Sequence, residues 1–588
     1  MGRGFEPRPA FTSVAQLVEQ WASPPPTLIS GIPLLSFPSY VRGFFMSRFN
    51  SRTARPAGTS PVATTGERAR TGEGATGFLR DSKSELFLLA VSNMVGQDTF
   101  YERAEDRDDR YSQLVRELAV LDPEWTAGLL RWLRGDGNLR SASLVGAAEF
   151  AKARLDAGLS GYSRQVVDAV LQRADEPGEM LGYWTSRYGR RLPKPVKRGV
   201  ADAVQRLYSE RALLKYDTAS KGYRFGDVLE LVHASPSAVW QGDLFKLAID
   251  RRHGRGDEVP ASLQVLRRNA ELRAAGAPEA WLDAEALRAA GMTWEDALSA
   301  VGSKVDKARL WEALIPSMGF MALLRNLRGF DEAGVSDGVA DQVAARLADP
   351  QQVVRSRQFP FRFWAAYKHA PSLRWGHALE RALAVSLDRV PRLQGRVLIL
   401  VDRSPSMFPG YGFSTPNRSD IPLAEQAAVF GAGLALRAEA PTLVEFGMRS
   451  SRIDVPKGGS VLRLIDKFGQ IDGTDIPSAV KEHFAGHDRV VVVTDEQTRP
   501  GWLPSNCYGH HGGMPETRID DLVPRHVPVY MWNMAGYRVG AMPSGARNRH
   551  AMGGLSDQAF RQIPLLEAGM DADWPWLTPV DAGPSHLG

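Results

Sequence analysis

The feature that most constrains the fold is an apolar run that ends in oxygen-bearing side chains. Residues 397–401 read VLILV. Asp402, Ser404 and Ser406 then follow at every second position. A near-continuous run of Val, Leu and Ile is typical of a strand buried on both faces of a parallel sheet. Ligands bind at the carboxyl edge of such sheets, so three oxygen donors stand where a site is expected.

The same pattern continues toward the C-terminus. Apolar β-type runs alternate with helical stretches and lie at 396–402, 442–447, 488–496 and 527–534. Strands that alternate with helices predict an open, doubly wound α/β sheet. We therefore expect an α/β domain over residues 394–580, followed by a short tail at 581–588.

Residues 80–393 carry helical patterning instead. Apolar residues recur three and four apart over 84–95. Asp122 as N-cap, Pro123 as first helical residue and Gly135 as stop signal delimit a further helix. Successive short amphipathic helices without a convincing strand favour an all-α stack of helix pairs.

The first 79 residues are predicted to form a disordered extension. The segment 46–78 is rich in Gly, Ser, Thr and Arg and lacks apolar periodicity. Residues 1–45 include a proline triplet and fit poorly with the remainder of the chain. We expect Met46 to be the natural start of the protein.

Composition excludes several kinds of site. Cys507 is the only cysteine, which excludes an intramolecular disulfide, a Cys-rich zinc site and an iron–sulfur cluster, and favours a cytoplasmic location. No run of about 18 apolar residues is present, so no membrane span is expected. The pair His510 and His511 is better read as part of a solvated loop than as metal ligands. No Ser/His/Asp or paired-carboxylate arrangement indicates a hydrolase, so we predict no catalytic residue.

The oxygen donors after the first strand have counterparts farther along the chain. Asp495 ends another apolar run, and Thr474 lies in a loop between the two. Hydroxyl and carboxylate oxygens suit Mg²⁺ or another divalent cation. The predicted metal ligands are Asp402, Ser404, Ser406, Thr474 and Asp495. We expect the two serines to bind directly, Thr474 directly or through water, and the aspartates largely through water. The alternative is that the serines only cap a turn.

A cluster of basic residues in the helical part indicates a polyanionic partner. The net charge of +5 over 588 residues does not by itself prove a nucleic-acid partner, so the clustering matters more. Lys and Arg neutralise phosphates, and the neighbouring rings of Tyr183, Trp184 and Tyr188 could stack on unpaired bases. The predicted RNA-binding residues are Arg187, Arg190, Arg191, Lys194, Lys197, Arg198, Lys215, Lys221, Arg224 and His233. The alternatives are a solvated loop at 187–199 and a core position for His233.

These motifs carry two family resemblances. The loops with Asp402–Ser406, Thr474 and Asp495 resemble the metal-ion-dependent adhesion site of the von Willebrand factor A domain. The pair MALLRNL at 321–327 and QVVRSRQFPF at 352–361, followed by an A domain, resembles the TROVE domain of the Ro autoantigen family. The combined resemblance covers about residues 80–580.

The resemblance implies a multidomain protein in which an all-α HEAT-like helical ring is closed by an A domain. It implies that small structured noncoding RNAs, called Y RNAs, bind outside the ring and that single-stranded 3′ ends of misfolded RNAs enter it. Bacterial relatives are associated with polynucleotide phosphorylase in RNA decay or maturation. Lys215 and His233 match RNA-contact positions of the family, and Lys221 is a provisional match.

We accordingly expect a monomeric, non-catalytic RNA-binding scaffold that carries Mg²⁺. The competing hypothesis is a Mg²⁺-dependent protein–protein adhesion module in which the helices only support the A domain and bind no RNA.

Overall fold

A computed structural model describes residues 58–92, 96–370, 372–388, 390–413, 421–501, 516–554, 560 and 562–577. The expectations for Met46, Cys507, His510, His511 and the tail at 581–588 concern residues outside this set. Within it, no helix is both long and apolar enough to cross a membrane.

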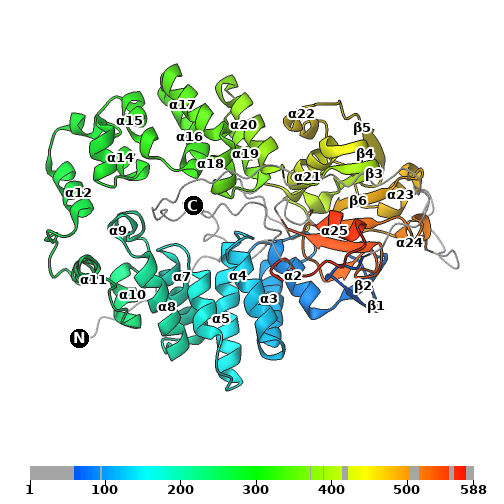
Figure 1. The fold of residues 1–588 in the computed structure, drawn as a ribbon, viewed down its shortest axis with the longest axis horizontal. Helices are drawn as coiled ribbons and strands as arrows, with labels where there is room; N and C mark the ends of the chain where they lie inside the picture. Colours follow the sequence, from blue (N-terminus) through cyan, green and yellow to red (C-terminus); the bar gives the residue numbers. More distant parts are fainter. Residues whose placement is uncertain are drawn as a thin grey trace, which may run out of the picture.

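The helical part is built from two arms that curve around to face each other (Figure 1). The first arm contains α2 (Ser82–Val91), α3 (Ala104–Leu121), α4 (Pro123–Arg134), α5 (Arg140–Asp156), α6 (Ser163–Val170), α7 (Glu176–Tyr188), α8 (Lys194–Leu207), α9 (Glu210–Tyr216), α10 (Phe225–Val232) and α11 (Val239–Arg252). The second arm contains α12 (Gln264–Ala274), α13 (Ala284–Ala289), α14 (Trp294–Val301), α15 (Lys307–Leu314), α16 (Phe320–Ala333), α17 (Asp337–Ala348), α18 (Pro350–Ser356), α19 (Pro360–His369) and α20 (Leu373–Ser386), with 3₁₀ turns η2 (Pro278–Leu282) and η3 (Ile315–Ser317).

Local signals place the helix ends where the sequence predicts them. The Asp122 carboxylate accepts a hydrogen bond from the Trp125 amide at 3.1 Å, Pro123 is the first residue of α4, and Gly135 follows its last turn. A side-chain acceptor at the N-cap satisfies an amide that the helix itself leaves unbonded. The predicted start and stop of this helix are confirmed.

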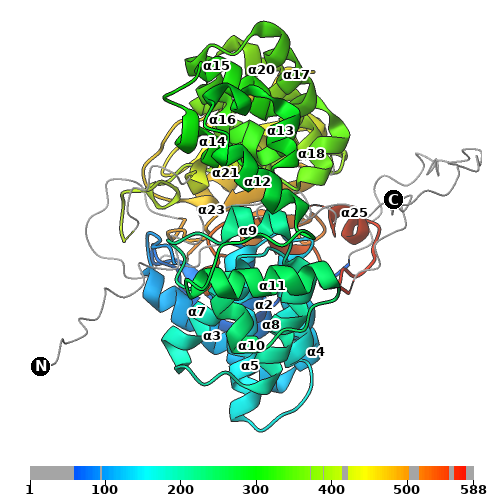
Figure 2. The same cartoon turned by 90° about the vertical axis from the view of Figure 1, so that its left-hand side faces the viewer.

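The two arms and the α/β domain close into a ring. At the first arm, Arg107 donates to the Ala535 carbonyl at 2.7 Å, and at the second, the Trp364 indole donates to Glu425 at 2.5 Å. The opposite ends of the arms meet where α9 contacts α12 (Figure 2). A further bridge runs from Asn138 to the carbonyl of Arg357, at 3.2 Å. The predicted helical ring is therefore confirmed.

The α/β domain contains a six-stranded sheet in the order β5-β4-β3-β6-β7-β9. Its strands are β3 (Leu393–Asp402), β4 (Ala438–Phe446), β5 (Ser450–Ile453), β6 (Arg489–Thr494), β7 (Val529–Asn533) and β9 (Arg549–Gly553), and its helical segments are η4 (Pro405–Met407), α21 (Leu423–Arg437), α22 (Val461–Ile465), α23 (Ile476–His483), α24 (Ile519–Leu522) and α25 (Gln562–Glu567). Every strand pair is parallel except β4 with β5.

Both faces of the sheet are covered, as the apolar run at 397–401 predicts. Ile399 and Val401 belong to the core that includes α21, whereas Leu398 and Leu400 pack with residues of α23 and α24. All four side chains are fully buried. Alternate residues of one strand therefore face opposite helical layers, which is the doubly wound arrangement.

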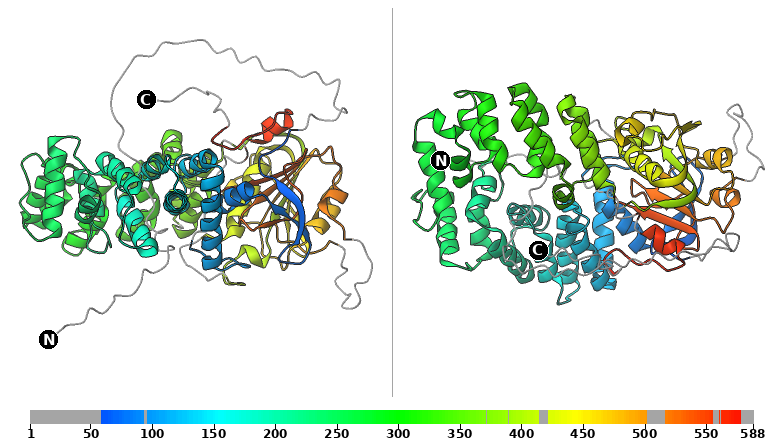
Figure 3. Two further views of the ribbon diagram at one scale, coloured as in Figure 1. Left: turned by 90° about the horizontal axis from the view of Figure 1, so that it is seen from below. Right: turned by 45° about the horizontal axis from the view of Figure 1, so that its top comes forward.

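The prediction of disorder is wrong for residues 58–79. Strands β1 (Thr64–Arg70) and β2 (Thr76–Arg80) form an antiparallel hairpin, and β2 pairs with β8 (Val539–Gly540) of the α/β domain (Figure 3). Most side chains of β1 face solvent, so its sequence carries no apolar alternation. The hairpin is ordered by backbone pairing and by contacts with residues more than 400 positions away, which a local pattern does not reveal.

Candidate functional site

The predicted metal ligands lie at the carboxyl edge of the parallel sheet. Asp402 is the last residue of β3, Asp495 directly follows β6, and Thr474 lies shortly before α23. Ser404 and Ser406 belong to the turn around η4. All five residues are at most 8% exposed. Because β3 and β6 are adjacent, the loop with Asp402–Ser406 after β3 lies beside the loop with Asp495 after β6.

Hydrogen bonds fix the first loop. One oxygen of Asp402 accepts from the Ser404 amide at 2.9 Å, and the other accepts from the Thr494 hydroxyl at 2.5 Å. The hydroxyl oxygens of Ser404 and Ser406 lie 3.1 Å apart. The Ser404 side chain makes no capping bond to η4, so the turn-capping interpretation does not describe it. Its hydroxyl is instead oriented within the oxygen cluster.

Sequence reasoning missed Thr494. This residue ends the apolar run of β6 and fixes Asp402 on the neighbouring strand. The available signal was a hydroxyl residue directly before Asp495. The loop of Thr474 is joined to the same edge through its carbonyl, which accepts from the Arg499 amide at 2.9 Å.

The electrostatics of the cluster favour a bound cation. Burial raises the pKa of Asp402, and burial together with the charge of Asp402 raises the pKa of Asp495. One Asp495 oxygen accepts from the Gln497 amide at 3.0 Å, but the other is buried without a hydrogen-bond partner in the described structure. Two buried carboxylates that repel each other are costly unless a positive charge compensates them.

The donor set fits a small, hard cation. Among the described residues, no group of three or more His, Cys, Asp or Glu side chains is arranged to hold a metal. The two aspartates would therefore need the hydroxyls of the cluster as further ligands. Oxygen donors with few carboxylates are typical of Mg²⁺ sites, which keep several waters. The orphaned Asp495 oxygen is the observation that supports this fit.

Half of the predicted RNA-binding residues form no ion pair in the described part of the chain, and most of these are exposed. Five of them lie on the connection from α7 to α8 and on the first turns of α8: Arg190, Arg191, Lys194, Lys197 and Arg198. Four are exposed and Lys197 is half-buried. None of the five forms an ion pair within the part of the chain that the structure describes. Their charges are therefore available to an external anion.

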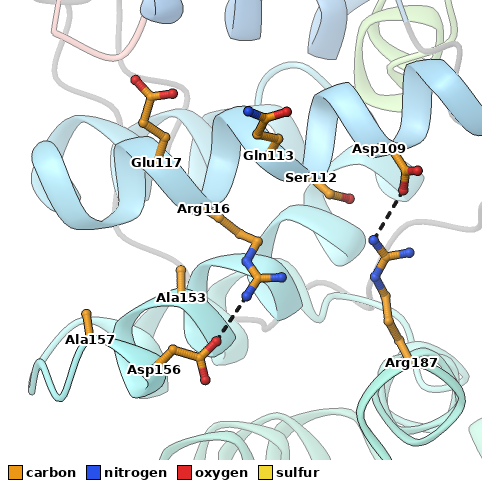
Figure 4. Close-up of a pocket in the computed structure, with 9 residues that line it drawn as sticks. All are labelled: Asp109, Ser112, Gln113, Arg116, Glu117, Ala153, Asp156, Ala157 and Arg187. Atoms are coloured by element: carbon orange, nitrogen blue, oxygen red, sulfur yellow. Dashed lines mark hydrogen bonds and ion pairs between the residues drawn. The ribbon is translucent and has the colours of Figure 1, made fainter.

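Other predicted positions are engaged within the protein. Arg187 pairs with Asp109 at 3.4 Å and with Glu149 at 3.3 Å, beside a cleft of about 550 Å³ between α3, α5 and α7 (Figure 4). Lys221 pairs with Asp175 at 3.5 Å. These side chains stabilise contacts between helices in the described state.

The second basic group lies around α9 and α10. Arg224 pairs with Asp217 at 2.6 Å. Lys215 is exposed beside the ring of Tyr216, and His233 is exposed at the left-handed C-cap of α10. The alternative of a core position for His233 is therefore wrong, because a residue that closes a helix end faces solvent here.

The aromatic residues of this region are less accessible than expected. Trp184 is only 2% exposed and packs in the core, so it is not available for stacking on a base. The hydroxyls of Tyr183 and Tyr188 both donate to Glu149, at 2.6 and 2.5 Å. Amphipathic helices hide such rings on their inner face, which the local sequence does not distinguish from an exposed one.

Comparison with known proteins agrees with this architecture. The TROVE domain model matches residues 286–381, a range that contains both predicted motifs at 321–327 and 352–361. Telomerase protein component 1 is 46% identical over 77 residues in Mus musculus and 43% identical over 77 residues in Rattus norvegicus. That stretch is 13% of this chain and only 3% of the length of either relative.

The fold as a whole is similar to that of a solved structure. The crystal structure of the Deinococcus radiodurans RO (RSR) protein superposes with a TM-score of 0.56 at 18% sequence identity. The match covers 83% of this chain and 100% of that chain. The TROVE match therefore lies inside the second helical arm, and the chain shares the fold of the RO (RSR) protein.

Proposed function

We propose that this protein is a non-catalytic RNA-binding component of a ribonucleoprotein. The TROVE match at residues 286–381 and the likeness of the fold to the RO (RSR) protein support RNA binding in general. The observation that carries the proposal is the group of five unpaired cationic side chains at 190–198, called here the α8 basic cluster: Arg190, Arg191, Lys194, Lys197 and Arg198. Unpaired cations on one stretch of surface bind phosphates by releasing condensed counterions.

The finer proposal concerns the kind of RNA. A structured noncoding RNA of the Y-RNA type would be held on the α8 basic cluster through its backbone, because duplex RNA is recognised mainly by shape and phosphates. Single-stranded 3′ ends of misfolded RNA would be received inside the ring, with Lys215 on α9 and His233, which are both exposed, as candidate contacts. RNA so held would be handed to a 3′-exoribonuclease such as polynucleotide phosphorylase in the cytoplasm. This assigns the protein to RNA quality control, maturation or decay.

Charge reversal of the α8 basic cluster tests the first part. The triple variant Arg190→Glu, Arg191→Glu, Lys194→Glu is expected to weaken binding of a stem-loop RNA on the order of 100-fold at about 0.1 M salt. The slope of log affinity against log salt should also fall by about three units, because three phosphate contacts are lost. Filter binding over a salt series, with and without a single-stranded 3′ tail, measures both quantities.

A matched variant controls for net charge. Lys457→Glu, Arg463→Glu and Lys481→Glu reverse three exposed charges on the α/β domain and should leave RNA affinity nearly unchanged. Equal losses in the two triple variants would show that only the overall charge matters. Unchanged binding in the α8 variant would remove this cluster from the RNA site.

The proposal includes Mg²⁺ at the sheet edge. Ser404, Ser406 and Thr474 would supply hydroxyl ligands, and Asp402 and Asp495 would hold bound waters and orient the serines. The cation would supply a positive centre that an acidic oxygen can approach. The chain's own part is to present these oxygens in a buried, preorganised arrangement.

Cation affinity should depend steeply on pH. The pKa values of Asp402 and Asp495 are raised in the metal-free fold, so protons compete with the cation as the pH falls. We expect the affinity for Mn²⁺, measured by calorimetry, to drop on the order of 100-fold from about pH 8 to about pH 5.5.

Stability without metal should change in the opposite direction. A carboxyl group whose pKa is raised on folding stabilises the fold at low pH and loses that contribution as the pH rises through its folded pKa. The metal-free protein should therefore become less stable toward about pH 8, and Mn²⁺ should restore the loss. A melting temperature of the metal-free protein that rises from about pH 5.5 to about pH 8 would contradict the raised pKa values of Asp402 and Asp495.

The second candidate function is Mg²⁺-dependent adhesion to another protein without RNA. The orphaned oxygen of Asp495 favours a metal but does not select between the two functions. Capture of a protein that survives nuclease treatment, requires Mg²⁺ and is lost in Ser404→Ala would favour adhesion.

A further inference from the structure

The turn of the N-terminal hairpin lies directly on the loop that carries Asp495. Between β1 and β2, the Thr71 hydroxyl donates to the Thr498 carbonyl at 2.5 Å, and the Gly72 amide donates to the Gln497 side chain at 2.8 Å. The backbone amide of Gln497 in turn donates to the Asp495 carboxylate at 3.0 Å. A single residue, Gln497, therefore links the hairpin turn to the predicted metal ligand Asp495 through hydrogen bonds.

Glu73, in this turn, is held toward the same edge by two partners. One of its oxygens accepts from the Tyr101 hydroxyl at 3.0 Å, and the other pairs with the Arg499 guanidinium at 3.4 Å. The backbone amide of Arg499 donates to the Thr474 carbonyl at 2.9 Å, so Arg499 is itself bonded to the loop that carries Thr474. The Glu73 side chain is only 23% exposed.

Tyr101 closes the arrangement from the segment between α2 and α3. Its ring lies edge-on to that of Tyr537, with centroids 5.4 Å apart. A Cβ on Gly72 would come within 2.5 Å of the Tyr101 ring, so the turn can approach this closely only because residue 72 is glycine. The Tyr101 hydroxyl donates to Glu73, and burial together with the negative charges of Asp495 and Glu73 raises the pKa of Tyr101.

We propose that Glu73 supplies a negative charge to the sheet edge that carries the predicted metal ligands. Together with the Tyr101 hydroxyl, Glu73 occupies the space through which a partner protein's carboxylate would approach the cation. The inference rests on the proposed cation site. In this arrangement Glu73 compensates the charge of the cation from within the chain. An external carboxylate then reaches the cation only when Glu73 is removed or displaced. The hairpin then fills the position that a protein ligand would take at an adhesion site.

Calorimetric titration with Mn²⁺, with and without excess acetate as the external carboxylate, tests this proposal on the full chain. Glu73→Gln should weaken Mn²⁺ binding about five- to tenfold, because one nearby negative charge is lost. Acetate should restore affinity in Glu73→Gln and leave the wild type unchanged. Tyr101→Phe, which keeps the ring and removes the hydroxyl, should show the same acetate response in weaker form.

The matched control is Glu67→Gln, which neutralises an exposed residue of β1 in the same hairpin and should bind Mn²⁺ as the wild type does. Wild-type affinity in Glu73→Gln, or an equal acetate response in wild type and variant, would overturn the role of Glu73. Loss of Mn²⁺ binding in Ser404→Ala, with binding kept in the wild type, supports the cation site independently. A wild type that binds no Mn²⁺ would refute the cation site and the inference with it.

Discussion

Replacing Arg80 with methionine is expected to lower the free energy of unfolding by about 3–5 kcal/mol. Arg80 ends β2 and pairs with Glu496 at 2.5 Å, and both side chains are 1% exposed. The Ala541 amide also donates to Glu496, at 2.9 Å. Removing the guanidinium leaves a carboxylate that is buried and has lost its counter-charge, which costs more than the pair itself contributes.

The measurement is urea denaturation followed by circular dichroism, together with the rate of proteolysis within the hairpin. Arg328→Met is the matched control, because Arg328 pairs with Glu332 at 2.7 Å while both side chains are more than half exposed. Loss of that exposed pair should lower the free energy of unfolding by less than about 0.5 kcal/mol. Adding Glu496→Gln to Arg80→Met should recover part of the loss, since the unpaired charge is then absent. Similar losses for Arg80→Met and Arg328→Met would contradict the assigned role.

Replacing Trp574 with alanine is expected to destabilise the protein by about 3–5 kcal/mol. Trp574 follows α25, the last helix of the α/β domain, but packs on the first helical arm. Its ring centroid lies 5.1 Å from that of Trp125 on α4 and 5.3 Å from that of Phe87 on α2. It is 8% exposed, so truncation removes a large buried surface and leaves a cavity.

The same substitution should detach the C-terminal segment from α2 and α4. We expect faster proteolysis near residue 574 and an earlier unfolding transition of the helical arm. Trp240→Ala is the control, because Trp240 on α11 is 39% exposed and its loss should cost less than about 1 kcal/mol. An unchanged transition in Trp574→Ala would show that the tryptophan cluster does not join the C-terminal segment to the ring.

Several features could be predicted from local sequence because their causes are local. The run at 397–401 is buried on both faces, and such a strand has to be apolar at every position. Asp402 and Asp495 end adjacent strands, so the topology rule for parallel sheets sufficed to bring them together. Asp122 and Gly135 delimit α4 through contacts within a few residues.

Other features depend on residues far apart in the chain. The hairpin at 64–80 has a polar outer face and is held by partners such as Thr498 and Tyr537. Nothing in its own sequence distinguishes it from the polar extension predicted there. Similarly, the acids that engage Arg187 and Lys221 lie far from them in sequence, Asp109 on α3 and Asp175 at the N-cap of α7.

The sequence by itself determined the two-part architecture, the oxygen cluster at the sheet edge and the stretch of basic residues before and within α8, because periodicity and residue chemistry are written along the chain. Only the tertiary structure decided which basic side chains form ion pairs, which aromatic rings are buried and which segment packs beside the oxygen cluster. Those properties depend on the distances between elements, and burial and ion pairing act through space rather than along the sequence.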